Sequence, residues 1–246
     1  MLYIKKIRPL PDVIESVNAI KRSEAWKQTQ DKDTDKIRKQ FDLLPKSSIR
    51  HTLLKEQRGL CAYCMKRILD DGSTTIEHWI PLSESKDHAL QYSNMLGVCH
   101  GGRRTGAEKQ RVLCCDARKG EGKITICPWK EEHIKDIAYK SNGIMYTLSG
   151  NDEFEKDINE TLCLNGLRDR KGNLIDTSTE IVKGRRDAVK WCNDFYRALD
   201  RQGKCTSRMV KKKIDEMEQA ENMPEFAGIK LFYLKKKCQE LEKRGR

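Results

Sequence analysis

The spacing of the cysteines constrains this chain more than any other feature of its sequence. Cys61 and Cys64 form a C-x2-C knuckle, a spacing that lets two thiolates reach one tetrahedral ion from a single tight turn. Cys99 and one of the adjacent residues Cys114 and Cys115 would complete a four-thiolate site. Because four protein ligands leave no open position for water or substrate, such a site would be structural.

We favour Cys115 as the fourth ligand, while Cys114 and His100 remain open alternatives. The predicted ligands of a structural zinc ion are Cys61, Cys64, Cys99 and Cys115. The competing interpretation is that these residues are buried free cysteines. The other cysteines stand singly at apolar positions and are predicted core residues: Cys127, Cys163, Cys192, Cys205 and Cys238.

The sequence contains no run of roughly 18 to 20 apolar residues that could span a bilayer, and its N-terminus lacks the apolar core of a signal peptide. We therefore expect a cytoplasmic protein. A reducing compartment makes a disulfide framework improbable, which again favours metal binding by the close cysteine pairs.

The net charge of +12 is concentrated near the N-terminus, where residues 1–60 carry 14 basic and 8 acidic side chains. A positive surface attracts polyphosphate ligands and binds nucleic acid by releasing counterions. The competing interpretation is that the charge serves solubility alone.

Hydrophobic periodicity and turn residues predict an α+β fold. We expect strands at 74–79, 124–129 and 144–148, and a long loop with one helical turn at 83–113. The expected helices span 154–164, 177–200 with Thr177 as N-cap, 206–220 and 225–243. We divide the chain into a basic helical lead-in (1–50), a cysteine-rich core (51–130), a small α/β extension (131–176) and a helical region (177–246).

A second pattern lies between the two halves of the cysteine set. Glu77-His78 is followed by Pro81, then by Asn94, and finally by the segment Cys-Asp-Ala-Arg-Lys-Gly at 115–120. This pattern over residues 61–120 resembles the HNH family of nucleases. The resemblance implies a zinc-stapled ββα-metal core, in which a β-hairpin and one helix surround a single divalent ion.

The resemblance also implies roles for individual residues. Glu77 and Asp116 would bind a catalytic Mg²⁺ or Mn²⁺, His78 would be the general base, and Asn94 would tie the loop and orient the histidine. These residue types suit the chemistry, because a cation bound by carboxylates neutralises a phosphodiester, while a histidine that is neutral at pH 7 can accept a proton from water. Structural hydrogen bonds or salt bridges are the competing interpretation.

Two departures from the family pattern are visible. Asp116 replaces the usual neutral ligand, and the insert 101–114 lengthens the distance between the last cysteines. The insert and the segment after it carry basic residues that could contact phosphates, although a solvated loop is an equal alternative. The candidate nucleic-acid-binding residues are Arg103, Arg104, Lys109, Arg111, Arg118 and Lys119.

The segments 97–102, 115–116, 157–159 and 162–165 are similar to a bacterial HNH subfamily, the PtuB-type nucleases of Septu anti-phage systems, some of which are joined to retrons. The resemblance implies antiviral defence and a partner ATPase of the ABC or SMC-like class (PtuA-like), with a retron reverse transcriptase and its nucleic acid as a further partner. No Walker A motif occurs in this chain, so a nucleotide-driven step would need that partner. The alternative is a zinc-stabilised, non-catalytic nucleic-acid-binding or adaptor module.

The helical region 177–246 contains no candidate catalytic cluster. We expect part of it to cover the core and part to dock a partner, with Phe226, Phe232 and Tyr233 as the candidate docking face. A helical bundle packed only on itself is the alternative.

Overall fold

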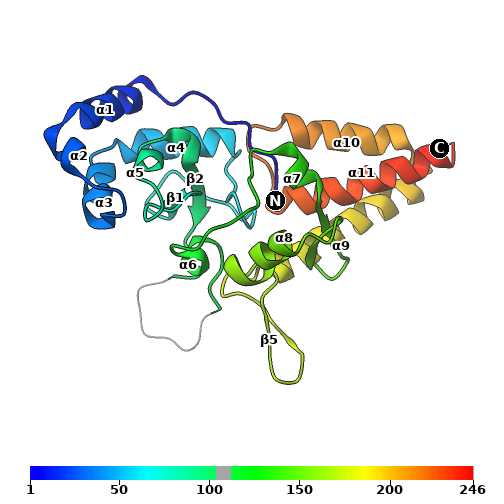
Figure 1. Ribbon diagram of the computed structural model, residues 1–246. Coiled ribbons are helices and arrows are strands. Elements are labelled where there is room, and N and C mark those ends of the chain that lie inside the picture. The colour runs from blue at the N-terminus through cyan, green and yellow to red at the C-terminus, as the bar shows by residue number, and fades with distance from the viewer. Residues whose placement is uncertain (104–111, 246) are drawn as a thin grey trace.

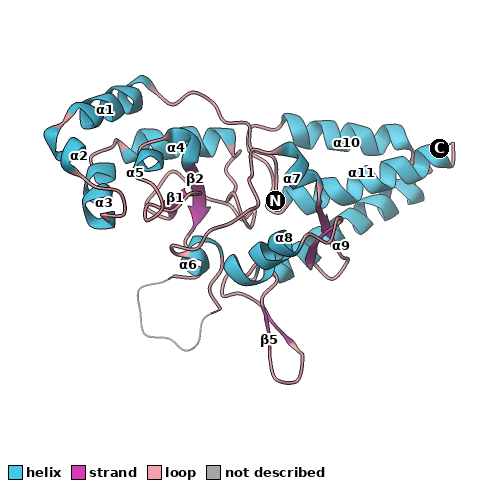
Figure 2. Cartoon of the chain, viewed as in Figure 1, coloured by secondary structure: helices cyan, strands magenta, loops and turns pink. Residues whose placement is uncertain are grey.

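The computed structural model describes residues 1–103 and 112–245, and over these residues the fold is α+β. Helices predominate, and the strands form three two-stranded antiparallel sheets (Figures 1 and 2). Arg104, Lys109 and Arg111, proposed above as nucleic-acid-binding residues, lie outside the described residues. Within 1–103 and 112–245, no helix combines the length and the apolar character that crossing a membrane requires.

Four helices form the N-terminal part of the molecule. They are α1 (Pro11–Arg22), α2 (Glu24–Gln28), α3 (Thr34–Asp42) and α4 (Lys46–Glu56). Side chains cap two of them, because Ser23 accepts a hydrogen bond from the Trp26 amide and Asp33 accepts one from Lys36. These helices enclose a hydrophobic core of their own, to which Leu90 and Met95 from the following segment also belong.

The central hairpin consists of β1 (Thr74–His78) and β2 (Met95–Cys99), paired so that Glu77 lies opposite Leu96 and His78 opposite Met95. The prediction of the first strand is confirmed. The second was expected to be part of a loop, and that prediction is wrong. Both faces of β2 are buried, so its apolar residues follow one another without the alternation that marks a half-exposed strand.

The hairpin separates two hydrophobic cores. Residues of β2 alternate between them, because Leu96 and Val98 belong to the core that contains the C-terminal helices, whereas Met95 belongs to the N-terminal core. Between the strands lie α5 (Lys86–Ala89) and a 3₁₀ turn (Tyr92–Asn94), and after them comes α6 (Cys115–Lys119).

The middle of the chain contains short elements. They are α7 (Glu131–Lys135), β3 (Ile137–Tyr139), β4 (Met145–Thr147), α8 (Asp152–Lys156), a π-helical turn (Asp157–Thr161), β5 (Leu167–Arg168) and β6 (Leu174–Ile175). The strand predicted at 124–129 is absent from this described segment. Its Thr125 and Ile126 amides donate to the carboxylate of Asp157 instead of to a neighbouring strand.

Three long helices close the chain: α9 (Ile181–Arg201), α10 (Ser207–Gln219) and α11 (Ala227–Lys243). They lie at the opposite end of the molecule from α1 to α3 (Figure 1). Helix α9 begins four residues later than predicted. The N-cap residue is Glu180 instead of Thr177. The first-turn amides donate to side chains further upstream, Ile181 to the Thr177 hydroxyl and Val182 and Lys183 to the Asp176 carboxylate.

The prediction that Phe226 belongs to a partner-docking face is wrong. This residue is buried, and its ring packs so closely on α9 that a Cβ at Gly184 would lie 2.3 Å from it. Phe232 and Tyr233 are half-buried, and the Phe232 ring meets the Tyr139 ring edge-on at 5.6 Å. The aromatic side chains of α11 therefore contribute to packing inside the chain.

Candidate functional site

Four cysteines from three separate segments gather beside the hairpin. The Sγ atoms of Cys61, Cys64, Cys99 and Cys115 all lie within 4.8 Å of one another. Two of the separations are 3.9 Å, between Cys61 and Cys115, and 3.7 Å, between Cys64 and Cys99. A tetrahedral zinc ion with Zn–S bonds of about 2.3 Å holds its sulfurs about 3.8 Å apart. The cluster therefore fits a single ion and could bind a structural metal such as zinc.

The knuckle at Cys61 is formed by backbone hydrogen bonds. The Met65 amide donates to the Cys61 carbonyl over 3.0 Å, and Met65 takes a left-handed φ of 65°. The neighbouring Ala62 amide donates to the Gly97 carbonyl of β2 over 3.1 Å. The turn that presents Cys61 and Cys64 is thus attached directly to the strand that ends in Cys99.

The structure distinguishes among the three candidates for the fourth ligand. Cys115 opens α6, and its sulfur lies in the cluster. The sulfur of Cys114 instead lies 3.2 Å from the Thr179 hydroxyl. His100 is exposed, with its Nδ1 3.4 Å from the Thr75 hydroxyl. The preference for Cys115 is the one that fits the geometry.

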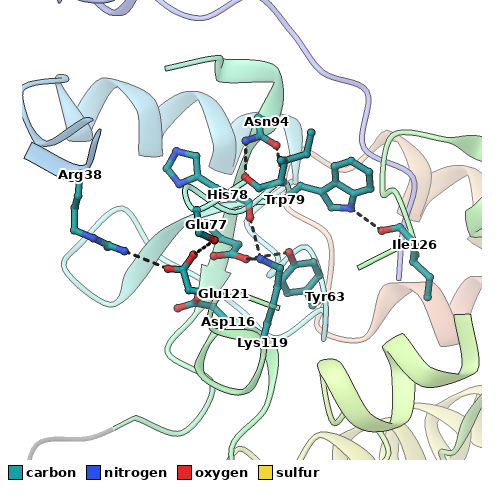
Figure 3. A network of polar contacts seen from close by, with 12 residues as sticks. Arg38, Tyr63, Glu77, His78, Trp79, Asn94, Asp116, Lys119, Glu121 and Ile126 are labelled. Carbon is teal, nitrogen blue, oxygen red and sulfur yellow. Dashed lines mark hydrogen bonds and ion pairs between the residues drawn. The ribbon is translucent and has the colours of Figure 1, made fainter. Parts of the chain in front are cut away.

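Glu77 and His78 are adjacent in β1 and point to opposite sides of the strand, as successive strand residues must. The Glu77 carboxylate faces α6, and the His78 ring points away from it (Figure 3). Both residues nevertheless line one pocket of about 210 Å³ near the end of the strand, together with Asp116 from α6 and Arg38 from α3. The hairpin therefore brings Glu77, His78 and Asp116 to a common space.

Glu77 is buried against a buried lysine. The Lys119 ammonium lies 2.6 Å from Glu77 Oε1, and the Tyr63 hydroxyl lies 3.5 Å from the same oxygen. Burial raises the pKa of Glu77 to about 8, with Asp116 adding to the rise and Lys119 opposing it. A pair of carboxylates in a buried setting would be stabilised by a further cation.

His78 is fixed by α5 and α3. Its Nε2 lies 2.9 Å from the Ala89 carbonyl oxygen, and its ring meets Phe41 edge-on with centroids 4.6 Å apart. Because a carbonyl oxygen only accepts, Nε2 must carry the proton, which leaves Nδ1 as the acceptor in the neutral ring. Burial lowers the pKa of His78 to about 4, so the neutral form prevails at physiological pH.

Asn94 links the two segments that hold the histidine. Its Oδ1 accepts from the Ile80 amide over 2.8 Å, and its Nδ2 donates to the carbonyls of Ile80 and His88, over 3.0 and 3.1 Å (Figure 3). All of these partners are backbone groups, and Asn94 is not among the residues that line the pocket. Its geometry is that of a positioning residue.

One of the candidate nucleic-acid-binding residues is enclosed at the pocket. The Lys119 side chain is 1% exposed, and its ammonium is held by Glu77 and by the His78 carbonyl oxygen at 3.0 Å, so it is not a surface cation. Arg118 is exposed and donates from Nε to the Glu160 carbonyl. Arg103 is exposed, lines the pocket and lies 3.4 Å from Asp116 Oδ2.

The sequence analysis missed two charged residues of the pocket. Arg38 comes from α3, and its guanidinium lies 3.5 Å from a carboxylate oxygen of Glu121 (Figure 3). Both side chains line the pocket. Nothing in the spacing around Arg38 indicated this position, since it depends on the packing of a distant helix. No protein-family model matches the chain, and comparison with curated proteins gives no significant match.

Proposed function

We propose that this chain is an HNH-type endonuclease that hydrolyses phosphodiester bonds of nucleic acid, with a structural zinc ion on its four cysteines. The observation that carries the proposal is that Glu77, His78 and Asp116 line one pocket, formed by a hairpin and a helix that the cysteine cluster joins. Motif and geometry thus agree on the same residues.

Glu77 and Asp116 are the residues that would hold a catalytic Mg²⁺ or Mn²⁺, because hard cations prefer carboxylate oxygens. The donor set supports the fit, because both carboxyl groups line the same pocket and Asp116 contributes to the raised pKa of Glu77. When bound, such an ion would neutralise charge on the phosphate and on the leaving oxygen. Lys119 orients the Glu77 carboxylate by holding one of its oxygens.

His78 serves as the general base in this proposal. The Ala89 carbonyl fixes the tautomer, so Nδ1 accepts the proton of the attacking water while Nε2 keeps its own. Asn94 maintains the spacing between the end of β1 and α5, which carries Ala89. Arg38 and Arg103 line the pocket and are the cations proposed to contact substrate phosphates.

The narrower resemblance supports a role as the nuclease effector of an anti-phage system of the Septu or retron type. In that role an ATPase of the ABC or SMC-like class would direct the nuclease. The support for this part of the proposal is the sequence similarity of segments within and after the motif. Co-purification of the chain with the product of a neighbouring ATPase gene is its direct test.

The decisive test of nuclease activity is cleavage of DNA and RNA by zinc-loaded protein, with and without Mg²⁺ or Mn²⁺. We expect His78→Ala to keep its fold and zinc and to lose about two to four orders of magnitude in cleavage rate, the usual contribution of a general base. His51→Ala is the matched control, because His51 is exposed, with its Nδ1 3.6 Å from an Asp70 carboxylate oxygen, and does not line the pocket. Wild-type protein that binds nucleic acid without cutting it would favour the non-catalytic adaptor.

A further inference from the structure

The guanidinium of Arg185 is buried, and the groups that accept its hydrogen bonds carry no charge. Arg185 lies in the first turns of α9 and is 0% exposed. Its Nη2 donates to the Leu164 carbonyl and to Asn165 Oδ1, and both acceptors are uncharged. Its Nε and Nη1 have no hydrogen-bond partner among residues 1–103 and 112–245. A buried charge of this kind is costly unless an opposite charge offsets it.

Two segments connect Arg185 with the four-cysteine cluster. The first is 162–165, in which the Leu162 carbonyl accepts from the Cys115 amide over 3.0 Å and the Leu164 carbonyl accepts from Arg185. Two carbonyls of one short segment thus hold a candidate metal ligand and the guanidinium. This segment therefore contacts both the cluster and Arg185.

The second connection runs through the start of α11. The Phe226 ring packs on Gly184, the residue that precedes Arg185, and the Phe226 amide donates over 2.9 Å to the carbonyl of Met65. Met65 directly follows the ligand Cys64 in the knuckle. On both sides, α9 therefore contacts a residue or segment that is hydrogen-bonded to a cysteine-bearing segment.

Charge complementarity explains this arrangement. A divalent ion with four thiolates carries a net charge of −2, and most of that charge would be buried, since Cys61, Cys64 and Cys115 are almost fully enclosed. Burial lowers the pKa of Arg185 to about 10, and Tyr139, Cys64, Asp176 and Cys115 all oppose that shift. Negative charge at Cys64 and Cys115 is thus among the groups that favour the charged form of the guanidinium.

We propose that Arg185 is the counter-charge of the four-cysteine metal centre, stabilising its negative charge and limiting the reactivity of its thiolates. The inference rests on the structural zinc of the proposed function and is independent of the nuclease reaction. It assigns α9 a role at the metal centre as well as in packing.

The test measures how fast zinc leaves the full-length, zinc-loaded protein when excess N-ethylmaleimide alkylates the thiolates, with a chromogenic chelator as reporter. We expect Arg185→Met to release zinc faster by about tenfold, the scale on which a neighbouring charge changes the proton affinity of a thiolate. Arg186→Met removes an exposed charge one residue away and should behave as wild type. Val189→Ala controls for general loosening of α9 at a buried apolar position.

Two further variants separate charge from hydrogen bonding and remain informative if Arg185→Met fails to fold. Arg185→Lys keeps the charge, and we expect zinc release close to the wild-type rate. Arg185→Gln keeps an amide donor for Leu164 and loses the charge, and we expect the accelerated rate. Wild-type release from Arg185→Gln would overturn the proposal, as would accelerated release from both Val189→Ala and Arg185→Gln to the same extent. Protein that purifies folded but without zinc would overturn the metal centre itself, whether or not it cleaves nucleic acid.

Discussion

Lys119 and Glu77 form a buried ion pair at the pocket. The pair lies at 2.6 Å with both side chains nearly enclosed, so each charge depends on the other for compensation. Replacing one partner of a buried pair leaves the other charge uncompensated, whereas replacing both leaves no buried charge. The single replacement should therefore cost more folding stability than the double replacement.

We predict that Lys119→Met lowers the free energy of unfolding by about 3 kcal/mol, and that the double variant Glu77→Gln/Lys119→Met recovers most of the loss. Urea denaturation of the zinc-loaded proteins measures both values. Lys123→Met is the control, since Lys123 forms an exposed ion pair with Glu84. Equal losses in the single and double variants would contradict the prediction.

At the scale of elements, the cysteine cluster is the point where the knuckle, β2 and α6 meet. These elements are short, and α6 has five residues, too few to be stable alone. Gly101 contributes to the same junction, because its carbonyl accepts from the Cys114 amide and a Cβ there would lie 1.9 Å from the Cys114 carbonyl oxygen. The junction therefore combines the four-cysteine cluster with a glycine at position 101, where a Cβ would not fit.

Cys61→Ser is expected to yield unfolded or insoluble protein, because the binding free energy of a structural zinc, on the order of 10 kcal/mol, is also folding free energy. Solubility, zinc content and circular dichroism provide the readout. Cys238→Ser should remain folded, since Cys238 is buried in α11 away from the cluster. A folded, soluble and metal-free Cys61→Ser protein would refute the zinc assignment.

Local spacing was sufficient to predict the knuckle and β1, because the residues involved are close in the sequence, whereas Glu77 and His78 were singled out by the family resemblance. It could not predict β2, whose two buried faces remove the strand signal. The contribution of Arg38 to the pocket and the pairing of Lys119 arise from contacts between distant segments, so they were also missed. Phe226 was misjudged because helical spacing does not tell whether an aromatic face meets a partner or the chain itself.

For the whole molecule, Phe226 at the start of α11 joins the C-terminal helices to the half that contains the four-cysteine cluster, because its ring packs on α9 and its amide donates to the Met65 carbonyl. Gly184 allows this contact, since any side chain there would collide with the enclosed ring of Phe226. The C-terminal region is therefore part of the main hydrophobic core, and its removal would expose that core.

We predict that Gly184→Ala lowers the free energy of unfolding by about 1–3 kcal/mol, the usual cost of overpacking, despite the better helix propensity of alanine. Thermal and urea unfolding measure the change. Gly72→Ala is the control, because a Cβ there meets nothing within 4 Å. An unchanged or raised stability of Gly184→Ala would show that the helices yield easily at this contact.

The β1–β2 hairpin lies between the two hydrophobic cores, so the side chains on its two faces are packed by different cores. His78 is held by Phe41 and Ala89, both from the N-terminal core, whereas Glu77 is held by Lys119 and contacts Tyr63 on the other side. The imidazole and the Glu77 carboxylate therefore lie on opposite sides of one strand and are packed by different hydrophobic cores. In the proposed reaction, the distance between the proton acceptor and the metal-binding carboxylates would depend on how these two cores meet at β1.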